Sequence, residues 1–283
     1  MPTGHAYAEL LEAARTAALT AAALLANARA EEIRAKGNPR DLVTEWDLRS
    51  EAIIRQTLEE RTPGIAILAE EGGESAPLEP SGPSGPTNMR WLVDPIDGTV
   101  NFAHGFPIWS VSIALENAQH QPIVGVVVAP ALGWWFEASL GGGARGRTGL
   151  DVDQPLRPLE VSKPATLEAA MLTTGFPYDR ATNPDNNFAA WDHLQRVAGA
   201  ARRLGSASID LCLVARGWMD GYWERRLKSW DIAAGALIVA EAGGTVTNMT
   251  GGPFDPHQGE VAATNGAIHQ ELLAELRLSR SRP

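Results

Sequence analysis

The chain has 283 residues, of which 44% are hydrophobic and 20% charged, so it can bury a large core and is not expected to be disordered. Its formal net charge of -10 comes without any block of lysine or arginine, which disfavours binding to nucleic acid or to anionic membranes. The single cysteine, Cys212, excludes an internal disulfide framework and agrees with a reducing, cytoplasmic location. We expect this side chain to pack in the core.

The first expected element is the Ala-rich stretch from Ala6 to Lys36. It has no basic segment at its start, as a signal peptide would, and charges such as Arg15 and Glu31 interrupt it. No run of about 18 uncharged apolar residues occurs anywhere in the chain, so no membrane span is predicted. We predict one long amphipathic helix on the surface of the core.

A turn and a second helix follow in the segment "KGNPRDLVTEWD". Thr44 is placed to cap the helix, with Asp47 three residues later, an arrangement typical of a capping box that opens a helix to about residue 61. The next segment, "PGIAILAEEGG", predicts a short buried strand that ends on the acidic pair Glu70 and Glu71. Acids at the end of a strand are positioned to face a cleft.

The rest of the chain divides into two patterns. The Pro-, Gly- and Ser-rich segment 75–88 predicts a mobile surface loop, and the strand-like segments from Arg90 onward predict an antiparallel meander. The run 141–158 is expected to break this meander and to separate an N-terminal α+β half (1–150), with two long helices, from a C-terminal half (151–283). In the second half, strand-like segments alternate with helical ones, which indicates α/β layering. The expected helices cover about 183–199, 206–216, 231–242 and 267–278.

The stretch "WLVDPIDGTVNF" crowds two carboxylates, Asp94 and Asp97, between an apolar run and a Gly-Thr pair. A strand would deliver Asp94, and Gly98-Thr99 would begin a short helix whose free N–H groups can hold an anion. Carboxylates beside an anion require cations between them, and hard ions such as Mg²⁺ take oxygen ligands of this kind. An Asx-rich turn explains the same four residues, so this motif alone does not decide between the two interpretations.

The surrounding motifs favour the metal site. Glu70-Glu71, then "WLVDPIDGTVNF", then "WDIAAGALIVAEAGG" with Asp231 at a helix start, resemble the inositol monophosphatase family, which belongs to a superfamily of metal-dependent, lithium-sensitive phosphatases. The similarity also covers "DLVTEWD", "GSASIDLCLVARGWMDGYWE" and "GGPFD", and therefore nearly the whole chain. It implies an α/β fold of the sugar-phosphatase type, a layered αβαβα sandwich.

The resemblance also implies a set of metal ligands. They are the side chains of Glu70, Asp94, Asp97 and Asp231 and the backbone carbonyl of Ile96, which would hold two or three Mg²⁺ ions. Taken alone, Glu70 is also compatible with a solvated strand end, and Asp231 with a partner of a helix dipole.

The implied reaction is hydrolysis of a phosphate monoester by a metal-activated water, with no protein nucleophile. By resemblance, Glu70 and the pair formed by Thr99 and Asp47 position and deprotonate that water. Asp47 is also explained by the capping box, and one carboxylate can serve both purposes.

Substrate binding is likewise implied by the resemblance. The corresponding residues are Asp97, Gly98, Thr99, Gly205, Ser206, Ala207, Glu224 and Asp231. Glu224 lies at the family's spacing, seven residues before Asp231, although a surface ion pair with Arg225 or Arg226 is the alternative. Lys36 matches a lysine that lies near the site in relatives, but it is also compatible with a solvated charge.

Other residues near the motifs are not assigned to the site. His104 would be an imidazole among hard oxygen ligands, so we expect it to be exposed or outside the metal shell. The tryptophans at positions 109, 134, 135 and 223 are expected to pack in the sheets. The run 141–158 departs from the family pattern, and "GGGARG" lacks the spacing of a nucleotide-binding loop.

The favoured function is therefore that of a cytoplasmic Mg²⁺-dependent phosphatase, homodimeric by analogy, acting on inositol monophosphate or a similar small polyol or sugar phosphate. A same-fold alternative acts on fructose 1,6-bisphosphate, a 3′-phosphonucleotide, NADP or histidinol phosphate. A non-catalytic metal-binding interaction domain is a third possibility. It is disfavoured because such a protein is expected to have lost some of the five motif residues Glu70, Asp94, Asp97, Thr99 and Asp231, and all of them are present.

Overall fold

The structure is a computed structural model that describes residues 7–78, 88–149 and 154–280. Its α-helices are α1 (Ala8–Leu25), α2 (Glu45–Arg61), α3 (Thr99–Ala103), α4 (Phe188–Val197), α5 (Ala207–Ala215), α6 (Ser229–Glu241) and α7 (His269–Arg280). Its strands are β1 (Ile33–Ala35), β2 (Leu42–Thr44), β3 (Ala66–Ala69), β4 (Gly73–Ser75), β5 (Arg90–Asp97), β6 (Ser110–Glu116), β7 (Pro122–Ala129), β8 (Trp134–Ser139), β9 (Gly143–Arg147), β10 (Arg157–Pro158), β11 (Met171–Thr174), β12 (Ala200–Arg202), β13 (Gly221–Arg225), β14 (Thr245–Thr247) and β15 (Glu260–Thr264). Short 3₁₀ helices cover Pro130–Leu132 (η2), Leu167–Ala169 (η3) and Pro256–Gln258 (η4).

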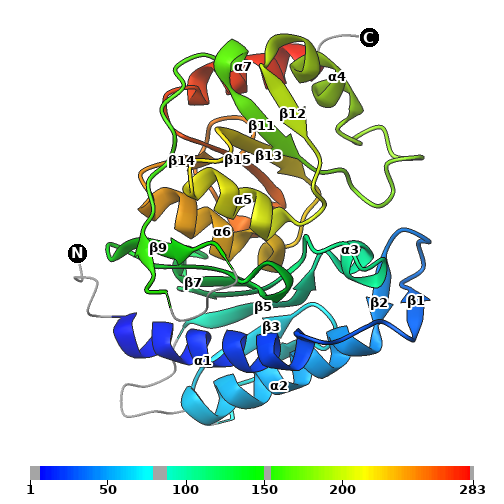
Figure 1. Cartoon of the computed structure of the whole chain (residues 1–283), viewed down its shortest axis with the longest axis vertical. Helices are drawn as coiled ribbons and strands as arrows, with labels where there is room; N and C mark the ends of the chain where they lie inside the picture. Colours follow the sequence, from blue (N-terminus) through cyan, green and yellow to red (C-terminus); the bar gives the residue numbers. More distant parts are fainter. Residues whose placement is uncertain (1–6, 79–87, 150–153, 281–283) are drawn as a thin grey trace.

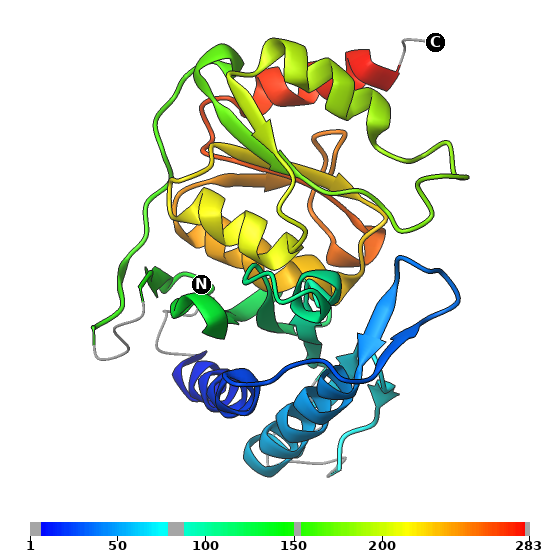
Figure 2. The ribbon, with the colours of Figure 1, turned by 45° about the vertical axis from the view of Figure 1, so that its right-hand side comes forward.

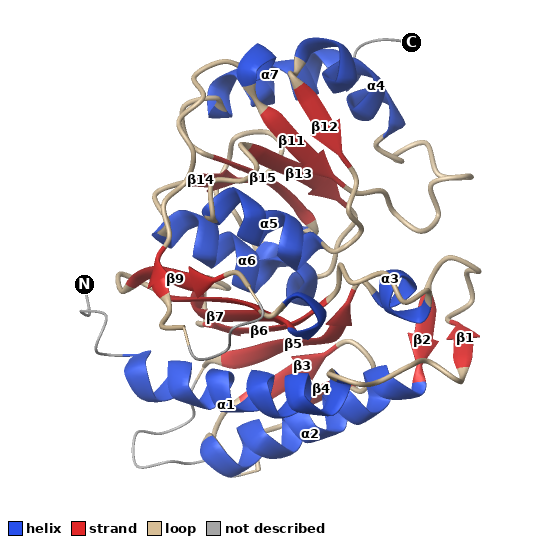
Figure 3. Cartoon of the chain, in the orientation of Figure 1, coloured by secondary structure: helices blue, strands red, loops and turns tan. Residues whose placement is uncertain are grey.

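These elements stack in five layers, as Figures 1 and 3 show. Helices α1 and α2 form the first layer, and the large sheet lies against them. Helices α5 and α6 form the middle layer, followed by the second sheet, with α4 and α7 on the outside. The predicted αβαβα sandwich is confirmed.

The large sheet has the strand order β10-β9-β8-β7-β6-β5-β3-β4, and the second sheet the order β12-β11-β13-β15-β14. The strands from β5 to β10 pair in antiparallel fashion, so the predicted meander is confirmed, while β3 joins β5 in parallel. The second sheet is mixed, with β11 parallel to both β12 and β13 and β15 antiparallel to β13 and β14.

The prediction that the run 141–158 ends the meander is wrong, because β9 pairs with β8 and β10 pairs with β9. One of the glycines that suggested a break, Gly146, has a packing reason instead. A Cβ atom on Gly146 would lie 2.8 Å from the carbonyl oxygen of Trp135 and 2.9 Å from the ring of Phe136. Glycine is therefore needed where β9 approaches its neighbour closely. The division of the chain at residue 150 stays a prediction.

The first helix is shorter than expected. The prediction of one helix over 6–36 is wrong in its second part, because α1 ends at Leu25 and the following segment leads into the β1–β2 hairpin. The carboxylate of Glu45 accepts the backbone N–H groups of Glu31 and Glu32 at 2.9 and 3.1 Å. These bonds, made by a residue of the next helix, hold the segment in a non-helical conformation. Figure 2 shows the hairpin standing beside α3.

The second helix begins as the sequence predicts. The hydroxyl of Thr44 accepts the N–H of Trp46 at 3.2 Å, and the Oδ2 of Asp47 accepts the N–H of Thr44 at 2.7 Å. Both halves of the predicted capping box are present, and α2 ends at Arg61 as expected. The predicted loop at 75–88 falls mostly outside the described residues.

Three hydrophobic cores lie between the layers. Strands β6 and β7 are buried along their whole length, because helices cover both faces of the large sheet, and β7 is correspondingly apolar on both sides. A Cβ atom on Gly125 would lie 2.9 Å from the carbonyl oxygen of Ala234, so this glycine lets α6 pack directly on β7. Cys212 is buried in the middle core, as predicted. No helix among the described residues is long and apolar enough to span a membrane.

Candidate active site

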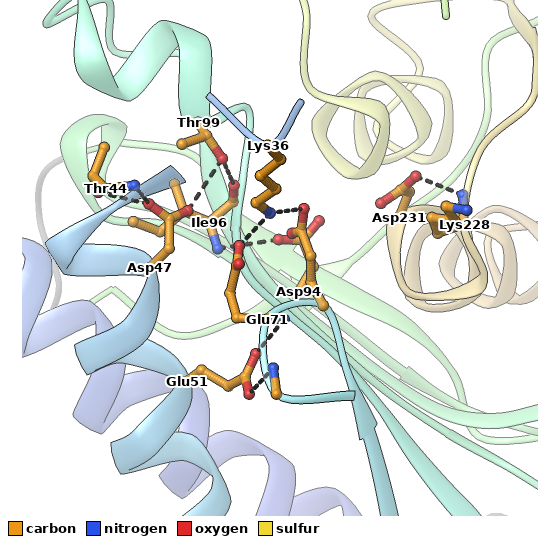
Figure 4. A network of polar contacts seen from close by, with 12 residues as sticks. Lys36, Thr44, Asp47, Glu51, Glu71, Asp94, Ile96, Thr99, Lys228 and Asp231 are labelled. Carbon is orange, nitrogen blue, oxygen red and sulfur yellow. Dashed lines mark hydrogen bonds and ion pairs between the residues drawn. The ribbon is translucent and has the colours of Figure 1, made fainter. Parts of the chain in front are cut away.

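Three structural elements from distant parts of the chain bring carboxylates to one cavity. Glu70 follows the end of β3, Asp94 lies in β5, and Asp231 lies in the first turn of α6. All three line a cavity of about 340 Å³. Figure 4 shows Asp94 and Asp231 facing each other across it, from the large sheet and from the middle helix layer.

Most of the residues predicted for the site line this same cavity. They are Glu70, Asp94, Ile96, Gly98, Thr99, Gly205, Ser206, Ala207, Glu224 and Asp231. Two predicted residues, Asp47 and Asp97, are not among the lining residues and contact the site through neighbours. The structure thus brings together segments that the sequence separates by more than a hundred residues, while the roles of these residues stay predictions.

Lys36 is the cation that reaches the carboxylates in this structure. Its Nζ donates to Oε1 of Glu70 at 2.9 Å and also to Oε1 of Glu71 (Figure 4). Lys36 comes from the turn of the β1–β2 hairpin and is only partly exposed, which excludes the interpretation as a freely solvated charge. Although burial acts against its charge, the two glutamates raise the pKa of Lys36.

The carboxylates of the cavity repel one another. Burial, and after it the charges of Glu70 and Asp97, raise the pKa of Asp94 well above its usual value. Burial and the charge of Glu70 do the same to the pKa of Asp231. Burial also raises the pKa of Glu70, although Lys36 acts in the opposite direction. Among the described residues, Asp94 and Asp231 form no ion pair with a cationic side chain, so this part of the cavity favours additional cations.

The oxygen atoms available here suit a hard divalent cation. Asp94 uses Oδ1 to accept the N–H of Ile96 at 3.0 Å, and Asp231 uses Oδ2 to accept the N–H of Lys228 at 2.7 Å. Neither of these two bonds uses the second oxygen of its carboxylate. The carbonyl of Ile96 accepts the Thr99 hydroxyl at 3.0 Å and retains a second lone pair. An all-oxygen donor set of this kind fits Mg²⁺ rather than a softer metal.

Thr99 and Asp47 form the pair that the sequence suggested. The Thr99 hydroxyl donates to Oδ1 of Asp47 at 3.1 Å, while Oδ2 of Asp47 accepts the N–H of Thr44 at 2.7 Å. One carboxylate therefore caps α2 with one oxygen and contacts Thr99 with the other, as Figure 4 shows. Burial raises the pKa of Asp47 to about 6, although its hydrogen bonds with Thr44 act against the shift.

Asp97 is bonded to the start of α5. Its Oδ2 accepts the hydroxyl of Ser206 at 2.7 Å and both the N–H and the hydroxyl of Ser208, and its Oδ1 accepts the N–H of Ala207 at 3.3 Å. These donors oppose the effect of burial, which raises its pKa. Asp97 therefore links the two halves of the chain. Its roles as metal ligand and as acceptor for substrate stay predictions.

Glu224 is a buried residue of the cavity wall, which rules out the surface ion pair with Arg225 or Arg226. Its Oε2 accepts the hydroxyl of Tyr222 at 2.6 Å, and burial raises its pKa to about 7. A Cβ atom on Gly175 would collide with this carboxylate at 2.1 Å, so a glycine is required where the wall meets Glu224.

Several residues of the cavity were not predicted from the sequence. Asp41, Tyr178, Arg203, Arg226 and Lys228 all line it. Arg203 could have been predicted, because Arg202 and Arg203 lie shortly before the "GSA" motif in a chain that is otherwise acidic. Tyr178 lies in a segment whose composition suggests no chemistry.

The histidine and the tryptophans that were not assigned to the site lie where the sequence predicts. His104 is exposed and lies outside the cavity lining. Trp109, Trp135 and Trp223 are buried, and Trp134 is half-buried. The expectation that the tryptophans pack in the sheets is confirmed.

Comparison with known proteins gives a consistent result. Residues 6–281 match the model of the inositol monophosphatase family. The chain is 43% identical to an inositol-1-monophosphatase of Synechocystis over 93% of this chain and 86% of that protein. It is 37% identical to the Nus factor SuhB of Pasteurella multocida, over 84% and 83% of the two chains. Among solved structures, the inositol monophosphatase of Anabaena superimposes with a TM-score of 0.81 at 37% identity, covering 95% of each chain.

Proposed function

Since this chain belongs to the inositol monophosphatase family and is a phosphoric monoester hydrolase, we propose that it hydrolyses inositol monophosphate with the help of Mg²⁺ in the acidic cavity. The observation that supports this most strongly is the convergence of Glu70, Asp94 and Asp231 on one cavity, where no arginine of the described residues forms an ion pair with them. Two or three ions are expected, held by these side chains together with Asp97 and the carbonyl of Ile96.

Bound Mg²⁺ would neutralise the phosphate and lower the pKa of an attacking water. The protein itself contributes orientation. Thr99, bonded to the buried carboxylate of Asp47, is placed to accept a hydrogen bond from the water and pass its proton toward Asp47, whose pKa of about 6 suits a base near neutral pH. Glu70 lies on the other side of the same cavity and can orient the water.

The substrate's hydroxyl groups need acceptors, and the cavity wall offers them. Glu224 is a buried carboxylate whose position is maintained by Tyr222. The N–H groups of Ala207 and Ser208, at the start of α5, are occupied by Asp97. We therefore expect Asp97 and Glu224, rather than the free backbone of α5, to contact the polyol ring. This chemistry favours a small polyhydroxylated phosphate ester as the substrate.

The relative named as a Nus factor suggests a second candidate, a role in binding partners rather than in hydrolysis. A protein kept only for binding has no need to retain a complete set of metal and water-positioning residues, and this chain retains all of them. Hydrolysis therefore remains the better supported function.

The proposal is tested by measuring phosphate release from a panel of esters. The panel contains inositol 1-phosphate, fructose 1,6-bisphosphate, a 3′-phosphonucleotide, NADP and histidinol phosphate, each with Mg²⁺ and with EDTA. The highest kcat/KM is expected for inositol 1-phosphate, with activity lost in EDTA. The Asp94→Asn variant, purified in the same way, reports any contaminating phosphatase. A higher kcat/KM for another ester would assign the chain to a different substrate, and activity that survives EDTA would contradict the metal mechanism.

A further inference from the structure

A second cluster of metal-binding side chains lies outside the acidic cavity. Glu116 ends β6, His120 lies in the turn between β6 and β7, and His257 lies in η4 of the C-terminal half. One ligand atom from each of the three side chains lies within 4.8 Å of the others. We propose that these residues bind a divalent transition-metal ion of the zinc class, which ties the first sheet to the C-terminal half.

The donor set selects the class of metal. Two imidazoles and one carboxylate suit Zn²⁺ and its neighbours, which accept nitrogen ligands, whereas Mg²⁺ prefers oxygen alone. The Nε2 of His257 and the Oε2 of Glu116 are 2.8 Å apart, and the two imidazole rings have centroids 4.4 Å apart. Ligand atoms around one tetrahedral ion are roughly 3.3 Å apart, given metal–ligand bonds of about 2.0 Å. The side chain of His120 is 45% exposed, so it can rotate by the small amount required.

Neighbouring groups hold the ligands in place, as is usual around metal-binding residues. Arg90 donates to Oε1 of Glu116 through Nε at 2.9 Å and Nη2 at 2.7 Å, which leaves Oε2 directed at His257. The Nδ1 of His120 lies 3.7 Å from Oδ1 of Asp255, so its Nε2 is the atom available to the metal. The Nη2 of Arg90 also lies 3.2 Å from Nε2 of His257, so an incoming cation must displace this contact and take the place of the direct bond between His257 and Glu116.

The charge around the cluster also favours a dication. The carboxylates of Glu116 and Glu74 share the guanidinium of Arg90, and the carboxylate of Asp255 lies beside His120. Two negative charges therefore remain if the histidines are neutral. A divalent ion with neutral imidazole ligands would balance them. His257 also lines a solvent-accessible cavity of about 460 Å³, which provides a route for the ion.

An ion bound at this cluster would also affect helix α6, which lies beside it. The segment η4 packs against α6, whose first turn carries Asp231. An ion shared by the β6–β7 hairpin and η4 would restrain the helix that closes one side of the acidic cavity. Binding is therefore expected to raise the melting temperature by about 5 °C at a hundredfold excess over Kd.

The test uses Co²⁺ as a coloured substitute for Zn²⁺. The full chain is stripped of metal, supplied with excess Mg²⁺ to occupy the acidic cavity, and titrated with Co²⁺. One equivalent is expected to produce the intense visible absorption of a four- or five-coordinate site with nitrogen ligands, and Zn²⁺ is expected to abolish it. His120→Ala and His257→Ala should each remove the band, while His104→Ala, at an exposed histidine elsewhere, should keep it.

Other readouts keep the test decisive. Circular dichroism and Mg²⁺-dependent phosphate release show whether each variant is folded, and His257→Gln replaces His257→Ala if the latter does not fold. The proposal is overturned if wild type gives only the weak absorption of octahedral Co²⁺, or if both histidine variants keep the band. Loss of the band in Asp94→Asn but not in His257→Ala would place the ion in the acidic cavity and also overturn it.

Discussion

Buried carboxylates occur in two kinds of surroundings in this protein. On the side of the large sheet that faces α1, Glu137 accepts the Nε of Arg15 at 2.7 Å and the indole N–H of Trp135 at 3.1 Å. In the acidic cavity, Asp94 and Asp231 each accept one backbone N–H and meet no arginine among the described residues. The negative charge of Glu137 is therefore balanced by an arginine, whereas those of Asp94 and Asp231 are not balanced by a contacting arginine in the described part of the chain.

The difference separates stability from function. A buried charge with a complete set of partners costs little, whereas clustered acids without cations raise the free energy of the folded state. The second arrangement persists because a bound ligand can supply the missing charge. We therefore expect substitutions in the two places to have opposite effects on stability and activity, and the following experiments test this contrast in order of expected effect.

The largest effect is expected for Asp94→Asn. Phosphate release should fall by at least about 10³-fold, because a ligand to the cation is lost. Without metal at pH 8, the free energy of unfolding should instead rise by about 2 kcal/mol, since the substitution removes repulsion with Glu70 and Asp97. Steady-state kinetics and urea unfolding in EDTA measure both. A variant that is inactive because it is unfolded would break the contrast.

The matched substitution at the other kind of site is Glu137→Gln. It should lower the free energy of unfolding by about 3 kcal/mol, because the positive charges of Arg15 and Arg145 lose their buried partner. The kcat of the folded protein should stay within about twofold of wild type, because Glu137 lies outside the acidic cavity. Urea unfolding and kinetics at low temperature check both. A stable variant with low kcat would contradict this assignment.

The pair of Thr99 and Asp47 offers a smaller effect and an internal control. Thr99→Val removes the hydroxyl that reaches Asp47 and should lower kcat by about 10²-fold. Thr99→Ser keeps the hydroxyl and should retain most of the activity. A purely structural role predicts similar losses for both variants. If the two variants have the same kcat, Thr99 does not act on the water.

The surroundings of Glu224 are intermediate between these two kinds. Its carboxylate is buried and accepts a hydrogen bond from the hydroxyl of Tyr222, which carries no charge to balance it. Its pKa is raised to about 7, so the folded state favours the protonated form and loses stability as pH rises from about 4.5 to 7. In EDTA, Glu224→Gln should therefore match wild type at pH 4 and be more stable by about 2–3 kcal/mol at pH 8. Urea unfolding across this pH range measures the difference. An equal gain at both pH values would rule out this ionisation as the cause.

Local features of the fold were predictable from the sequence, and features made by distant residues were not. The capping box of Thr44 and Asp47 needs only neighbouring residues, and it was predicted correctly. The non-helical segment after Leu25 was not, because a carboxylate from the next helix binds the backbone of Glu31 and Glu32. The break expected at 141–158 failed for a similar reason, since Gly146 in this run allows a close contact with β8.

The candidate site also has features that the sequence predicted and features that it did not. The sequence by itself predicted which acids meet in one cavity, because acids next to Gly-Thr and at a helix start form a recognisable order along the chain. Only the tertiary structure decided how those acids are neutralised. It placed Arg15 on Glu137 across 122 positions, and among the described residues it gave Asp94 and Asp231 no arginine of this kind. Charge balance depends on distances in space, and sequence separation does not specify them.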